Sequence, residues 1–136
     1  MTKNKVEFLI ENDIMIDHLS QKDTTIYSDL EIAMSIGICF TSAINVAELY
    51  FNTRTLEEKN AVNSVMFALK ILGIHPRYSL TITEFFNKVT SVRDALICSV
   101  AKFNKLPILT NEVERFQYSG IKIIPSNELR GQIDIR

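Results

Sequence analysis

The chain has 136 residues, of which 46% are hydrophobic and 23% charged, and this composition suits one folded domain with a buried core. Its formal net charge of −1 excludes a global positive field that would attract nucleic acid, so any such partner needs a local patch. With only four glycines and three prolines, the chain is not a low-complexity or loop-dominated sequence.

In the first half of the chain, apolar runs and capping residues predict alternating strands and helices. A buried strand is expected over 6–10, followed by a helix over 14–19 and another over 29–35 that Gly37 ends. A second buried strand is expected over 38–41, and Asn45 can cap a helix over 46–50. Apolar residues at helical spacing then predict a long helix over 56–72, which Gly73 ends.

The second half continues the alternation. Residues 74–78 are a strand candidate that Pro76 weakens, because proline cannot donate a ladder hydrogen bond. Helices are expected over 82–89 and, capped by Ser91, over 92–104, and strands over 106–109 and 121–124 with a helical turn at 113–116 between them. Strands that are apolar throughout and separated by helices predict an α/β fold with a parallel sheet covered on both faces.

The two cysteines and the hydropathy pattern indicate in which cellular compartment the protein is expected. Cys39 and Cys98 stand in apolar surroundings, which favours two buried thiols in a reducing compartment over a disulfide. No apolar run reaches the roughly 20 residues of a membrane span, and the N-terminal residues lack the apolar core of a secretory signal. We therefore expect a cytoplasmic protein that makes no membrane contact.

Acidic residues recur where predicted strands end or helices begin. Glu11 and Asp13 follow the first strand, and Glu48 and Asp94 lie near the starts of two helices. Glu112 comes two residues after Thr110, which ends the strand over 106–109. In open α/β sheets ligands bind beyond the carboxyl ends of the strands, so these acids can share one edge. Such a set of carboxylates suits Mg²⁺ and metal-assisted hydrolysis of a phosphodiester.

Each acid taken alone also has a simpler structural explanation. Segments 45–48, 91–94 and 111–114 resemble capping boxes, and acids in first turns stabilise the helix dipole. The expected convergence of several acids at one edge favours a metal site over this alternative. His18 and His75 do not stand beside acids at helical ligand spacing, which disfavours zinc.

Three segments of the chain contain most of the candidate acids. The first segment is Phe-Leu-Ile-Glu11-Asn-Asp13, and the second is Asn-Val-Ala-Glu48-Leu. The third is Asp94-Ala-Leu-Ile followed by Leu-Pro-Ile-Leu-Thr110 and Phe116. In their order and spacing these segments resemble the PIN domain family, small magnesium- or manganese-dependent nucleases that include the VapC-type toxins of toxin–antitoxin pairs. The resemblance covers nearly the whole chain, from residue 6 to about residue 124.

The resemblance implies one PIN-like domain over 1–136, with its core at about 6–124. The implied fold is a three-layer α/β/α arrangement around a central parallel sheet of four to five strands. It also implies an endoribonuclease that uses Mg²⁺ or Mn²⁺, with an antitoxin protein and a second copy of the chain as partners. The implied metal-binding and catalytic residues are Glu11, Asp13, Glu48, Asp94 and Glu112, and Thr110 matches a hydroxyl residue that orders the site.

Basic residues near these acids are candidates for contacts with RNA phosphates, although such residues are more often plain surface charge. They are Arg93, Lys102, Lys105 and Arg115. Two other functions stay open. Glu11 stands where the family has Asp, which supports a degenerate PIN-like domain that binds RNA or protein without cutting. A phosphoacceptor receiver domain would share the α/β pattern, but no Asp follows the strand candidate at 74–78 to accept phosphate.

Overall fold

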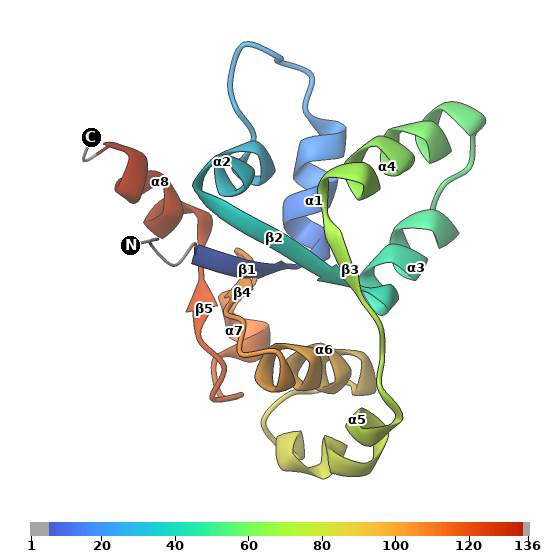
Figure 1. Ribbon diagram of the computed structural model, residues 1–136, viewed down its shortest axis with the longest axis vertical. Coiled ribbons are helices and arrows are strands. Elements are labelled where there is room, and N and C mark those ends of the chain that lie inside the picture. The colour runs from blue at the N-terminus through green and yellow to red at the C-terminus, as the bar shows by residue number, and fades with distance from the viewer. Residues whose placement is uncertain (1–5, 135–136) are drawn as a thin grey trace, which may run out of the picture.

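The computed structural model describes residues 6–134 and arranges them in three layers around one parallel sheet (Figure 1). The strands are β1 (Val6–Ile10), β2 (Gly37–Ser42), β3 (Lys70–Leu72), β4 (Ile108–Leu109) and β5 (Ile123–Ile124). The helices are α1 (Asn12–Ser20), α2 (Asp29–Ile36), α3 (Ala43–Phe51), α4 (Leu56–Ala68), α5 (Pro76–Thr81), the 3-10 helix η1 (Ile82–Phe85), α6 (Val92–Phe103), α7 (Val113–Phe116) and α8 (Ser126–Asp134). Neighbouring strands all pair in parallel, in the order β3-β2-β1-β4-β5. The predicted α/β/α fold with a parallel sheet of four to five strands is confirmed.

The central strand β1 packs into two separate cores. Because successive side chains of a strand point to opposite faces, Phe8 and Ile10 enter one core and Leu9 enters the other. The first core contains residues from α1, α2, α4 and α8, and the second contains residues from α5, α6 and α7. In Figure 1 these two groups of helices lie on opposite sides of the sheet. Strands that are apolar on both faces, as predicted, need this double cover.

The predictions between residues 56 and 81 were wrong about two strands, one missed and one wrongly expected. The helix expected over 56–72 ends at Ala68, and Lys70–Leu72 forms the edge strand β3, which pairs in parallel with β2. The strand candidate at 74–78 is absent, since Pro76 instead occupies the first turn of α5. Proline suits that place because its missing N–H would have no helical partner there. Short apolar runs fit a helix and a strand equally well, so the backbone groups that β2 offers decided the outcome.

Two further predictions need correction, and one helix was not predicted. Ser42, not Asn45, caps α3: the Ser42 hydroxyl accepts from the Asn45 backbone N–H, and the Asn45 side chain reaches back to the Ser42 backbone N–H. The helix expected over 82–89 is reduced to the 3-10 helix η1. The C-terminal helix α8 had no prediction; it packs on α2, with Leu129 fully buried and Arg130 Nε 2.7 Å from Asp29 Oδ1.

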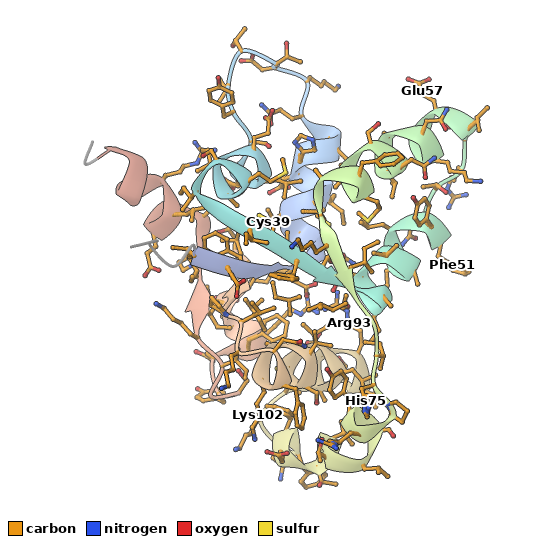
Figure 2. The ribbon with its side chains drawn as sticks, viewed as in Figure 1. Cys39, Phe51, Glu57, His75, Arg93 and Lys102 are labelled. Carbon is orange, nitrogen blue, oxygen red and sulfur yellow. The ribbon has the colours of Figure 1, made fainter. Side chains whose placement is uncertain are left out.

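The thiols behave as expected. Cys39 and Cys98 are both free and buried, at 4% and 0% exposure, and Figure 2 labels Cys39 on β2. Burial raises the pKa of each thiol to about 12. In the part of the chain that the structure describes, no helix has the length and apolar character needed to cross a bilayer.

Candidate active site

The predicted acids meet at the carboxyl edge of the sheet, beside its topological switch point. Strands β1 and β4 are neighbours, while the chain runs from β1 toward β2 and from β4 toward β5, on opposite sides. Two loops diverge there and leave a crevice, which is where open α/β sheets bind ligands. Glu11 directly follows β1, and Thr110 directly follows β4.

Glu11 is the buried centre of this site, with 1% of its surface exposed. It is the N-cap of α1, and its Oε1 accepts a hydrogen bond from the Asn12 backbone N–H at 2.8 Å. Asn45 on α3 donates from Nδ2 to the same oxygen at 2.7 Å. A buried carboxylate is costly to desolvate unless it is hydrogen-bonded and paired with a charge. Glu11 therefore depends on the cation that faces it.

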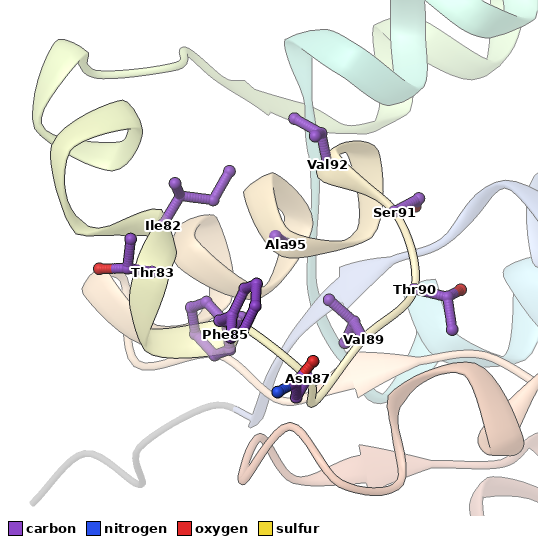
Figure 3. A pocket seen from close by; sticks show the side chains of 10 residues that line it. Ile82, Thr83, Phe85, Asn87, Val89, Thr90, Ser91, Val92 and Ala95 are labelled. Carbon is purple, nitrogen blue, oxygen red and sulfur yellow. The ribbon is translucent and has the colours of Figure 1, made fainter.

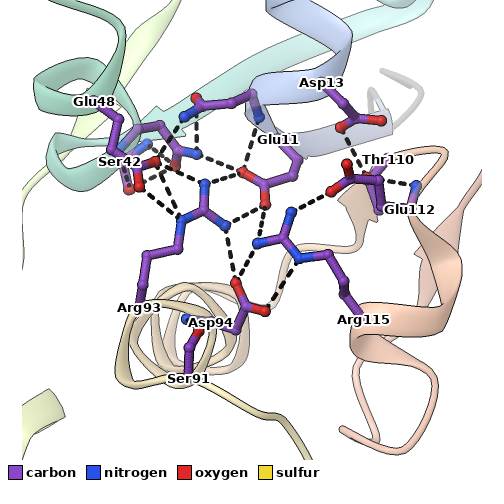
Figure 4. Close-up of polar contacts among 12 residues, drawn as sticks. Glu11, Asp13, Ser42, Glu48, Ser91, Arg93, Asp94, Thr110, Glu112 and Arg115 are labelled. Carbon is purple, nitrogen blue, oxygen red and sulfur yellow. Dashed lines mark hydrogen bonds and ion pairs between the residues drawn. The ribbon is translucent and has the colours of Figure 1, made fainter. Parts of the chain in front are cut away.

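That cation is Arg93, whose guanidinium group lies between three carboxylates (Figure 4). Its Nη1 pairs with Glu11 Oε2 and donates to Asp94 Oδ1 at 3.0 Å. Its Nη2 donates to Glu11 Oε1 at 2.7 Å and to Glu48 Oε1 at 2.8 Å. Burial alone lowers the pKa of Arg93, but the hydrogen bonds and charges of these carboxylates outweigh it and raise the pKa above its usual value.

A second guanidinium group, from Arg115 on α7, closes the other side of the site. It pairs with Asp94, where Nε donates to Oδ2 at 3.2 Å, and with Glu112, and its Nη2 lies 3.5 Å from Glu11 Oε2. Burial lowers the pKa of Arg115, but its hydrogen bonds to Asp94 and Glu112 outweigh this effect and raise the pKa. Four carboxylates thus face two guanidinium groups, and the cluster keeps an excess of negative charge.

Asp13 lies at the rim of the cluster and does not touch either arginine. Its Oδ1 accepts from the Thr110 hydroxyl and its Oδ2 from the Asn111 backbone N–H, both at 2.8 Å. The buried Thr110 hydroxyl also accepts from the Glu112 backbone N–H at 3.0 Å, so it ties the two loops together. Burial raises the pKa of Asp13, its two hydrogen bonds partly offset this, and the charges of Glu11 and Glu112 add to the rise.

Some residues of the site were not anticipated as such. The Asn12 side chain donates to Glu48 Oε1 at 2.7 Å and accepts from Asn45 Nδ2 at 3.1 Å, so it links α1 to α3. The spacing of Ser42 and Asn45 is that of a capping box and could have indicated the buried Asn45. Arg93 was expected to face RNA phosphates, and the structure instead places it among the acids. The contact between Arg93 and the acids joins segments that are far apart in the sequence. The sequence pattern of any one segment therefore does not indicate it.

The two predicted lysines lie away from the acids. Lys102 follows Asp94 by eight residues on α6, which is about 12 Å along the helix at about 1.5 Å per residue. It forms an ion pair with Glu84 on η1, and Figure 2 shows it at the opposite end of α6 from Arg93. Lys105 follows the end of the same helix. These lysines are not part of the acidic site, and their contact with RNA stays a prediction.

The oxygens of the cluster have the chemistry that Mg²⁺ prefers, but their arrangement here does not suit the ion. Within residues 6–134, no three acidic, histidine or cysteine side chains are placed to share a metal. The reason is visible in Figure 4, where the guanidinium group of Arg93 fills the space between Glu11, Glu48 and Asp94. The carboxylates therefore lie together, as the sequence predicted, but an arginine side chain occupies the space between them.

Two of the hollows in this region are lined by residues at the start of α6. A cleft of about 590 Å³ opens beside the cluster and is lined by Asp13, Glu48, Arg93, Glu112 and Arg115, among others. A separate pocket of about 320 Å³ lies between η1 and the start of α6 (Figure 3). Its lining is mostly apolar and includes no carboxylate, as Ile82, Phe85 and Val92 illustrate. The acidic cleft is therefore the candidate site for chemistry.

Solved structures with a similar fold include three toxin–antitoxin proteins. VapBC2 from Rickettsia felis, bound to a DNA fragment from its promoter, has a TM-score of 0.71 and 16% identity, covering 88% of this chain and 98% of that chain. VapBC-1 from nontypeable Haemophilus influenzae has a TM-score of 0.70 and 16% identity, covering 90% of this chain and 99% of that chain. DNA-bound VapBC from Salmonella typhimurium has a TM-score of 0.67 and 20% identity, covering 89% and 98%. At such identities the likeness concerns the fold.

A search of curated proteins finds no match to this chain. The family model described as "PIN domain" matches residues 9–118. The match begins within β1 and ends just after α7, so it includes every carboxylate of the cluster. The sequence segments, the parallel five-stranded sheet and the matched model agree, and the chain belongs to the PIN domain family.

Proposed function

We propose that this protein is a divalent-metal-dependent endoribonuclease, the toxin component of a toxin–antitoxin pair. The Mg²⁺ or Mn²⁺ ion would be bound by oxygens of the acidic cluster, and an RNA phosphodiester would be the substrate. PIN domains are generally nucleases, and proteins with a similar fold have been solved as toxin–antitoxin complexes.

The observation that carries this proposal is the convergence of acids from distant parts of the chain. Glu11, Glu48, Asp94 and Glu112 come from four separate segments and meet through two shared guanidinium groups. Helix capping explains why a single acid stands at the start of one helix. It does not explain why four acids from different segments lie together. Packing like charges together costs free energy, and a fold keeps such a cost where the site has a use for it.

The test is cleavage of a panel of transfer, ribosomal and messenger RNAs by the purified protein without its antitoxin. Reactions would contain Mg²⁺, Mn²⁺ or EDTA. An Asp94→Asn variant keeps the shape of the buried side chain and removes its charge. Glu57→Gln is the matched control, because Glu57 is an exposed acid on α4, far from the cluster (Figure 2). We expect metal-dependent cutting at defined sites by wild type and Glu57→Gln, and none by Asp94→Asn.

A second candidate function is favoured by one observation. Glu11 replaces the family's Asp, and Arg93 fills the centre of the cluster, which suits a PIN-like domain that binds RNA or protein without cutting. This alternative predicts no difference between wild type and Asp94→Asn with any metal, together with retained RNA or protein binding. Circular dichroism of both samples would establish that they are folded.

For the antitoxin we propose a groove between α1, α3 and α4. Ile16, Leu19, Leu49 and Val62 provide its apolar lining, and it reaches the acidic site through Glu48. An apolar segment seated there would sit beside the site that it has to inhibit. We also propose that the toxin is a homodimer in a cytoplasmic setting. Sedimentation of the purified chain, with and without its partner, measures both associations.

A further inference from the structure

Arg93 occupies an unusual place for a cation. Ser91 caps α6, so Arg93 is the second residue of that helix. The N-terminal end of a helix carries partial positive charge and favours acids over arginine or lysine. A positive side chain is stable here only because carboxylates from other segments surround it, and only 21% of that side chain is exposed.

The hydrogen bonds of Arg93 engage the oxygens that a metal ion would need. Besides the contacts of its terminal nitrogens, its Nε lies 3.2 Å from each carboxylate oxygen of Glu48. One planar group therefore joins Glu11, Glu48 and Asp94, which come from three elements. Arginine suits this role because its donors form a rigid fork and its charge is never lost near neutral pH.

We propose that the Arg93 guanidinium group is a built-in cation of the acidic site, which holds Glu11, Glu48 and Asp94 together without metal and must swing out before a divalent ion can bind among them. This inference rests on the proposed function, since it presumes that the cluster takes a metal. It makes Arg93 an autoinhibitory residue rather than a contact for RNA phosphates.

The surroundings allow the side chain to leave. Arg93 lines the open cleft of about 590 Å³ beside the cluster, so the guanidinium group has room to move toward solvent. Glu48, one of its partners, is 38% exposed on its side chain, so that pair is open to water. The cluster keeps more carboxylates than guanidinium groups, and a divalent ion would compensate the excess better than a single positive charge.

The affinity for metal measures this competition. If the site accepts metal only when Arg93 is out, the apparent dissociation constant equals the intrinsic one divided by the fraction of open molecules. An arginine held by three carboxylates keeps that fraction small. Removing the guanidinium group should therefore tighten metal binding by at least about tenfold, the change expected when about one molecule in ten is open.

The experiment titrates Mn²⁺ into wild type, Arg93→Gln, Arg93→Lys and Lys59→Gln, following free Mn²⁺ by electron paramagnetic resonance. Lys59→Gln is the matched control, because it removes one positive charge from an exposed position on α4. We expect Arg93→Gln to bind at least about tenfold more tightly than wild type, and Arg93→Lys to lie between them, since lysine keeps the charge without the fork. Lys59→Gln should match wild type.

A measurement on the unaltered protein covers the case in which a variant fails to fold. Saturating Mg²⁺ should shift the ¹⁵N–¹H resonance of Arg93 Nε to the position of a solvent-exposed arginine. Equal Mn²⁺ affinity in wild type and Arg93→Gln, with an unmoved Nε resonance, would overturn the inference but leave a metal-dependent nuclease intact. Absence of metal binding in every protein would overturn the inference and the proposed metal dependence together, and Arg93 would be a permanent structural ion pair.

Discussion

Asn45 should contribute far more stability than its place near the start of a surface helix suggests. It is fully buried, its Nδ2 donates to Glu11 Oε1 at 2.7 Å, and it completes the capping box with Ser42. In Asn45→Ala the loss of a hydrogen bond to a buried carboxylate costs about 1.5–3 kcal/mol. Ser42 still caps the helix in this variant, but its backbone N–H loses the Asn45 side-chain acceptor, which adds about 1 kcal/mol. We therefore expect the free energy of unfolding to fall by about 2.5–4 kcal/mol.

Urea unfolding followed by circular dichroism measures this change directly. The slope against urea should stay constant while the midpoint falls, because the fold itself is kept. Asn52→Ala is the matched control: Asn52 is exposed at the end of α3, where its side chain bonds the Glu48 carbonyl oxygen. Its loss should cost about 0.5 kcal/mol or less. If Asn45→Ala costs no more than Asn52→Ala, Asn45 does not hold Glu11, and the reasoning is refuted.

Three other outcomes follow from the packing. Gly37→Ala should lower the urea midpoint strongly, because a Cβ there would lie 2.1 Å from a backbone oxygen of β1; Gly73→Ala, where a Cβ meets nothing within 4 Å, serves as its control. Phe116→Ala should cost about 3–5 kcal/mol in the same assay, since Phe116 is fully buried, and a cost below about 1 kcal/mol would show that this core tolerates its loss. Cys39 and Cys98, with pKa values raised to about 12, stay protonated at pH 8, so Ellman's reagent should react with them only after denaturation; rapid reaction of the native protein would contradict their burial.

Local sequence patterns were enough to predict most of the helices and strands. Short, mostly apolar runs located β1, β2, β4 and β5, and helical spacing with a serine cap located α6. The edge strand β3 was missed because Lys70–Leu72 continues the helical spacing of α4, and its two exposed side chains and one partly buried side chain give no separate signal. The Asn45 cap was misplaced by three residues because Ser42 and Asn45 are both good capping residues, and the sequence alone does not rank them.

The acids Glu11, Glu48, Asp94 and Glu112 were recognisable from the sequence by themselves, because strand ends and helix starts are local features and parallel strands bring them to one edge. The sequence also determined that β1 is a buried strand that packs on both faces. It determined too that Cys39 and Cys98 lie in apolar surroundings. Only the tertiary structure decided what balances the acids. Arg93 is 82 residues from Glu11 along the chain, and an ion pair over that separation depends on how β1 and α6 pack, which no local pattern encodes.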